Sequence, residues 1–147
     1  MKKIFLLLFI SCCWISCDKN RNNQYSTWFI NGESFYSRDV SFETNKGGNH
    51  LSTDSKDNGF NLGSEMGGRP HPGYIGISTD YNSYNPALFR AYFYRNGTYY
   101  SLSRHNPDSV LVSLPNGKVR YEMPVAWFVN YNNPADSVQI SGTFNEP

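Results

Sequence analysis

The sequence predicts an all-β protein, organised as a single antiparallel β-sandwich of roughly eight strands. Apolar and polar residues alternate along most of residues 25–147. Gly, Pro, Asn and Asp interrupt this pattern about every 8–12 residues, as is typical of sandwiches and barrels. The segment is long enough for one hydrophobic core and too short for two. A lipocalin-like barrel is the alternative architecture.

The first strand pair is marked by Asn31-Gly32, which lies between the segments 27–30 and 33–36. Asn-Gly is the strongest short-range signal for a β-hairpin, because a type I′ turn requires positive φ at both central residues. The region that follows is rich in Gly and Asn. It predicts only short strands, around residues 50–53, 60–62 and 74–78.

A second Asn-Gly pair predicts the clearest hairpin of the chain, between the segments 87–95 and 98–102. A two-residue loop at Asn96-Gly97 pairs Arg95 with Thr98 and so fixes the register. This register sets Phe93 opposite Tyr100 on one face of the sheet and Tyr94 opposite Tyr99 on the other.

Three further strands are predicted toward the C-terminus. Residues 110–114 turn at 115–117 into 119–123, residues 126–131 form a mostly apolar strand, and 137–144 form the last one. The large side chains expected in the core are Trp28, Phe89, Phe93, Trp127 and Phe144.

The N-terminus has the organisation of an export signal. Lys2 and Lys3 precede the apolar run 4–10, and Ser16 and Cys17 follow it. The run is too short for a membrane-spanning helix, which needs about 20 apolar residues. These residues resemble the bacterial lipoprotein signal, in which cleavage occurs before a cysteine that then carries lipid. The resemblance implies lipidation at Cys17.

We therefore expect a signal peptide over 1–16, a lipidated tether over 17–24 and the β-domain over 25–147. Trp14 departs from the resemblance, because an aliphatic residue usually stands there, and an ordinary secretory signal is the alternative. Cys12 is a competing cleavage site. All three cysteines lie at positions 12, 13 and 17, so cleavage before Cys17 leaves no other thiol in the protein.

Both ends of the β-domain are similar to small uncharacterised Bacteroidota lipoproteins. The similarity rests on the opening segment 28–35 with its Asn-Gly turn and on the closing Ile-Ser-Gly-Thr-Phe of 140–144. It implies a β-domain attached to the outer membrane through a lipid anchor, and it implies no activity. Lys19 faintly resembles a surface-export signal. The sequence is therefore compatible with a location on either the periplasmic or the surface face of the outer membrane.

The charge of the mature chain excludes some partners. The chain has 13 basic and 12 acidic residues, and loss of Lys2 and Lys3 leaves 11 basic ones and a net charge of −1. Nucleic-acid binding needs a basic stripe or patch, and the sequence has none. We expect no nucleic-acid partner.

Aromatic residues provide the candidate ligand site. The chain contains 11 Tyr, 10 Phe and 3 Trp. The hairpin register brings Tyr92, Tyr94 and Tyr99 together on the outer face of the sheet, with Arg90 nearby. Such a cluster can stack on sugar rings or on a peptide, or it can simply stabilise the hairpin by cross-strand pairing.

Two serines are candidates for modification. Ser109 and Ser137 each lie within Asp-Ser-Val, which resembles the Bacteroides O-glycosylation acceptor. Each motif follows an Asn-Pro pair, so both segments are also explained as turns that lead into strands.

No catalytic or metal-binding motif is present. His50, His71 and His105 lack the spacing of metal ligands, and no serine lies in a Gly-x-Ser-x-Gly elbow. We therefore expect a non-enzymatic, cofactor-free lipoprotein that binds a glycan or an envelope protein. The alternative is a structural or accessory subunit of an outer-membrane complex, without a ligand pocket.

Overall fold

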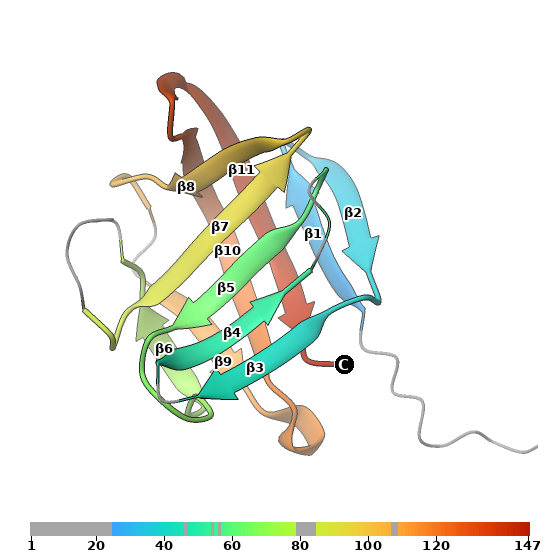
Figure 1. Ribbon diagram of the computed structural model, residues 1–147, viewed down its shortest axis with the longest axis vertical. Coiled ribbons are helices and arrows are strands. Elements are labelled where there is room, and N and C mark those ends of the chain that lie inside the picture. The colour runs from blue at the N-terminus through green and yellow to red at the C-terminus, as the bar shows by residue number, and fades with distance from the viewer. Residues whose placement is uncertain (1–24, 46, 54, 56, 79–84, 107–108) are drawn as a thin grey trace, which may run out of the picture.

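A computed structural model describes residues 25–45, 47–53, 55, 57–78, 85–106 and 109–147. These residues form one antiparallel sheet that curls into a half-barrel (Figure 1). The prediction of an all-β, antiparallel fold is confirmed. The strands are β1 (Ser26–Ile30), β2 (Glu33–Ser37), β3 (Ser41–Asn45), β4 (Gly48–Ser52), β5 (Phe60–Ser64), β6 (Gly73–Gly76), β7 (Phe89–Arg95), β8 (Thr98–Leu102), β9 (Ser109–Ser113), β10 (Arg120–Asn130) and β11 (Asn133–Asn145).

The main path of the sheet has the order β2-β1-β11-β10-β8-β7-β5-β4-β3, and β9 pairs with β10 while β6 pairs with β9. Strand β10 is the branch point, because Arg120–Glu122 pairs with β9 whereas Phe128–Asn130 pairs with β8. The described chain thus has eleven strands in one continuous sheet, where roughly eight in a two-sheet sandwich were expected. The curl brings β3, β4, β5 and β7 in front of β10 and β11 (Figure 1).

The three predicted hairpins form, and the hairpin at Asn96-Gly97 has the predicted register. Asn96 and Gly97 have φ of 50° and 75°, and Arg95 pairs with Thr98. Asn31 and Gly32 have φ of 50° and 85°, and they join β1 to β2. The third turn is a 3₁₀ turn, η1 (Pro115–Gly117), which joins β9 to β10.

Three strands differ from the prediction. Residues 119–123 and 126–131 belong to one strand, β10, because the chain continues through a bulge between Met123 and Ala126. Strand β11 begins at Asn133, earlier than expected. Strand β3 was not predicted, because it lies at an edge of the sheet and carries a single apolar residue, Phe42.

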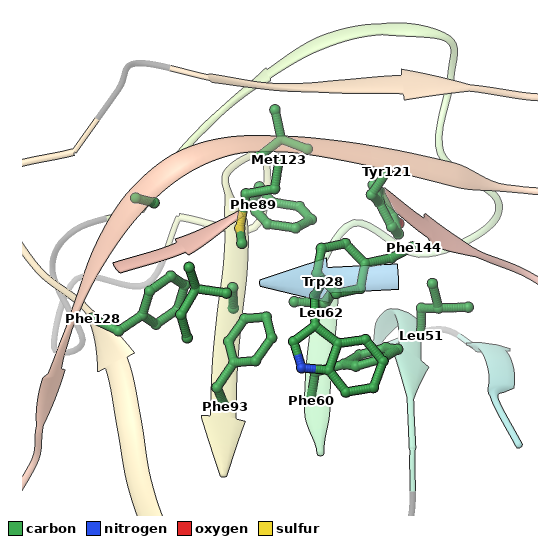
Figure 2. Packing of buried hydrophobic residues seen from close by; sticks show 14 of the residues in the cluster. Trp28, Leu51, Phe60, Leu62, Phe89, Phe93, Tyr121, Met123, Phe128 and Phe144 are labelled. Atoms are coloured by element: carbon green, nitrogen blue, oxygen red, sulfur yellow. The ribbon is translucent and has the colours of Figure 1, made fainter. Parts of the chain in front are cut away.

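Aromatic rings fill the inside of the curl (Figure 2). Trp28 meets Phe60 edge to face at 5.1 Å, and Phe60 meets Phe144 at 4.8 Å. Phe93 on β7 packs against Phe128 on β10, with 5.0 Å between the ring centroids. The rings come from strands β1, β5, β7, β10 and β11, so this cluster joins the two halves of the curled sheet.

The prediction is wrong for one core residue. Trp127 lies on the outer face and is 42% exposed, whereas Ala126 and Phe128 are buried. Side chains along β10 alternate between the two faces of the sheet, so neighbouring residues cannot both point inward. Phe128 points inward, and Trp127 therefore points outward. The other four expected core residues, including Trp28 and Phe144, are buried as predicted.

The side chains of Asn49, Ser64 and Tyr121 are paired with one another inside the half-barrel, whereas Trp28 Nε1 is buried without a hydrogen-bond partner among the described residues. The Asn49 amide nitrogen donates to Ser64 Oγ at 2.9 Å, and its oxygen accepts a 2.6 Å hydrogen bond from the Tyr121 hydroxyl. Burial raises the pKa of Tyr121, so the hydroxyl keeps the proton that it donates. Among the described residues, no helix has the length and apolar character needed to span a membrane.

Candidate functional site

The three predicted tyrosines lie together on the outer face of β7 and β8. Tyr92 stacks on Tyr99 at 5.4 Å, and Tyr94 contacts Tyr99 edge-on at 5.6 Å. All three side chains are half-buried. Their rings therefore cover part of one another's surface.

Arg90 lies on the same strand but is paired away from this cluster. Its guanidinium forms a 2.8 Å ion pair with Glu65. With the ring faces stacked and the nearby cation paired, the arrangement favours hairpin stabilisation over ligand binding. A ligand at Tyr92, Tyr94 and Tyr99 stays a prediction.

The two candidate glycosylation sites lie on different strands, Ser137 within β11 and Ser109 at the start of β9. Ser137 is exposed on β11, and the preceding Asp136 accepts hydrogen bonds from Tyr100 and Asn130, both at 2.9 Å. Ser109 is half-buried at the start of β9. Cys17 and its tether lie outside the described residues.

A surface groove of about 540 Å³ lies on the outer face, and sequence reasoning missed it. Five neighbouring strands contribute to it, in the order β6, β9, β10, β11 and β1. Its lining consists of Thr27, Phe29, Tyr74, Ser109, Leu111, Glu122, Met123, Pro124, Ser141, Gly142 and Thr143.

The register of the sheet explains why these residues meet. Tyr74 pairs with Leu111, Leu111 with Glu122, and Glu122 with Thr143, which in turn pairs with Thr27. Paired residues point to the same face of a sheet. One row of outward side chains therefore crosses five strands.

The β10 bulge and Gly142 shape the floor of the groove. Within the bulge, Pro124 and Val125 are both exposed, which interrupts the alternation of the strand. A Cβ at Gly142 would lie 2.6 Å from the Thr27 carbonyl oxygen and 2.8 Å from Trp28 Cβ. Glycine therefore permits the close approach of β11 to β1 beneath the floor.

Two exposed aromatic rings flank the polar floor. Phe29 on β1 is 42% exposed and Tyr74 on β6 is 76% exposed. In the described part of the chain, no hydrogen bond is formed by the hydroxyls of Thr27, Ser109, Ser141 and Thr143. Glu122 likewise forms no ion pair with another described residue. The groove thus offers apolar ring faces, free hydroxyls and one carboxylate.

Part of this site has a signal in the sequence. Successive side chains of a strand point to opposite faces, so a strand that buries Trp28 and Ile30 must expose Phe29. Tyr74 is far from Phe29 in the sequence, and only the pairing of β6 through β9 and β10 to β11 and β1 brings the two rings to one groove.

Metal ligands do not gather in the described residues, since no three His, Cys, Asp or Glu side chains lie close enough to hold an ion. Comparison of the chain with family models, curated proteins and solved structures finds no match. The site must therefore be interpreted from its own chemistry.

Proposed function

We propose that this protein is a lipid-anchored protein of the cell envelope whose β-domain binds a glycan without converting it. The observation that carries the binding function is the groove, in which Phe29 and Tyr74 are exposed beside hydroxyls that form no hydrogen bond with another described residue. A sugar ring has apolar C–H faces and a rim of hydroxyls. Aromatic side chains can pack against the C–H faces, and the oxygens of Ser, Thr and Glu can form hydrogen bonds with the hydroxyls at the rim.

The anchor rests on the N-terminal sequence. Lys2 and Lys3, the short apolar run and Ser16-Cys17 support cleavage before Cys17 and lipidation there. The resemblance to Bacteroidota lipoproteins supports the outer membrane as the location. A lipid anchor would hold the groove at a surface where envelope glycans are concentrated.

Binding without hydrolysis follows from the acidic groups of the groove. Most glycoside hydrolases use two carboxyl groups on either side of the scissile bond. Among the described residues, the groove lining contains one carboxylate, that of Glu122. We therefore expect a bound oligosaccharide to be released unchanged.

A glycan array probed with the full-length, lipidated protein in detergent tests the proposal. We expect a defined set of glycans to bind, and Phe29→Ala and Tyr74→Ala each to weaken binding about tenfold, equivalent to about 1.4 kcal/mol. Trp127→Ala is the matched control, because Trp127 is as exposed as Phe29 and lies outside the groove. Absence of glycan binding, or equal losses in all three variants, would contradict the proposal.

A further inference from the structure

Two tyrosines and an arginine form a second surface cluster where the described chain begins. Tyr36 at the end of β2 contacts Tyr25 edge-on, with 6.5 Å between ring centroids. The guanidinium carbon of Arg38 lies 4.2 Å from the centroid of the Tyr25 ring. Tyr36 is 76% exposed and Arg38 is also exposed. We refer to Tyr25, Tyr36 and Arg38 as the tether-side patch.

The tether is short compared with the domain. Seven residues lie between Cys17 and Tyr25, and the eight steps of chain that join the two span at most about 29 Å when fully extended. Asn145 at the end of β11 donates a 2.6 Å hydrogen bond to the Tyr25 carbonyl, so this end of β11 lies beside the patch. The other end of the strand, at Asn133, is about 40 Å away at the usual rise per residue. A lipid on Cys17 therefore brings the patch to the bilayer more readily than the opposite end.

We propose that the tether-side patch contacts the headgroup region of the membrane and sets the orientation of the domain on it. This inference rests on the proposed lipidation of Cys17 and is independent of glycan binding. Tyrosine is enriched at membrane interfaces because its ring is apolar and its hydroxyl is polar. Arginine suits anionic headgroups, because its planar guanidinium binds phosphate through two hydrogen bonds.

The charges around the patch are compatible with this contact. Lys118 and Arg120 lie at the same end of the half-barrel, because Arg120 pairs with Asn145. The nearby Glu146 is paired with Arg69 at 2.6 Å. Asp39 is exposed directly after Arg38 and offsets its charge, so the two tyrosines provide the larger share of the contact.

Fluorescence quenching by spin-labelled lipids tests the orientation. The full lipidated protein is placed in vesicles of phosphatidylethanolamine and phosphatidylglycerol, with an environment-sensitive dye at Asp39→Cys or, as the control, at Asp57→Cys. Both positions are exposed, and each variant loses one negative charge. Asp57 lies at the opposite end of the half-barrel, where its main-chain carbonyl accepts a hydrogen bond from the Asn96 amide. We expect several-fold stronger quenching at position 39, and a loss of this difference when Tyr36→Ser and Arg38→Gln are added.

Three results would overturn the inference, and they have different meanings. Equal quenching at both positions on vesicle-bound protein would contradict the patch while leaving the anchor intact. A mature protein without acyl mass on Cys17 would contradict the anchor and, with it, this role of the patch. Retention of the difference in the Tyr36→Ser/Arg38→Gln variant would assign the orientation to the tether alone and would also reject the patch.

Discussion

At the residue scale, Asn49 shows how a buried amide is accommodated in an aromatic core. Its nitrogen donates to Ser64 Oγ and also lies within 3.4 Å of the carbonyl oxygens of Met66 and Gly68. Its oxygen accepts from the Tyr121 hydroxyl. A buried polar group without a partner costs far more than a paired one contributes, so these bonds fix the position of the 65–72 loop relative to the core.

Tyr121→Phe removes one of these bonds and keeps the ring. We expect the free energy of unfolding to fall by about 1–2 kcal/mol, because the Asn49 oxygen loses its best donor inside the protein. Urea titration measures the change, and Tyr36→Phe on the surface is the control. Equal stability of the Tyr121→Phe variant and the wild type would show that Asn49 is satisfied without this hydroxyl.

Residue exposure could be predicted where strand alternation is regular. Phe93 and Tyr100 are inside as expected, because the Asn96-Gly97 turn fixes their register. Trp127 was placed inside because its segment is apolar on both faces, and apolar content alone does not say which face is buried. The bulge before Ala126 was not visible in the sequence, and it also creates part of the groove.

At the scale of elements, the turn between β10 and β11 is held by side chains as well as by the ladder. Asp136 accepts from Asn130 across the turn and from Tyr100 on β8. These two hydrogen bonds lower the pKa of Asp136. Desolvation, together with the hydrogen bond to Asp136, raises the pKa of Tyr100. The carboxylate thus links three neighbouring strands.

Acid should weaken this link. Because the pKa of Asp136 is lower in the folded than in the unfolded protein, its ionised form stabilises the fold at neutral pH. That contribution is lost as the pH falls below the ordinary aspartate range. We expect Asp136→Asn to lower the thermal midpoint at pH 7 and to differ less from the wild type at pH 3.

Thermal melts of both proteins across this pH range measure the effect, with Asp57→Asn as the control for loss of a surface charge. A constant difference between Asp136→Asn and the wild type at all pH values would contradict the assigned role.

The predictable elements are those joined by local turns. Both Asn-Gly hairpins and the β9–β10 pair are readable from sequence, because their partners are neighbours along the chain. The groove depends on β1 pairing with β11 and on β6 pairing with β9. Such pairings between distant segments leave no signature in a single sequence. The tyrosine cluster was therefore predictable and the groove was not.

At the scale of the whole molecule, Phe144 connects the two halves of the curled sheet, because its ring on β11 contacts rings on β1, β5 and β7. Its ring lies 4.8 Å from Phe60, 5.8 Å from Phe93 and 6.3 Å from Trp28. We expect Phe144→Ala to cost about 3–5 kcal/mol, as is usual for removal of a buried ring. This is a large part of the 5–15 kcal/mol typical of small domains.

Phe29→Ala is the comparison, because it removes an exposed ring on the neighbouring strand. Chemical denaturation should show a small change for Phe29→Ala and a large one for Phe144→Ala. A large loss in Phe29→Ala would mean that its effect on glycan binding reports unfolding and not contact.

The position of β11 between β1 and β10 has a consequence for biogenesis. During synthesis the N-terminal segment emerges first, yet β1 can complete its pairing only after Asn133–Asn145 has followed. The central strands are therefore late to close, and pairings between distant segments form slowly. Late closure is compatible with the proposed export, because a translocation channel that accepts only unfolded polypeptide requires a chain that has not yet folded.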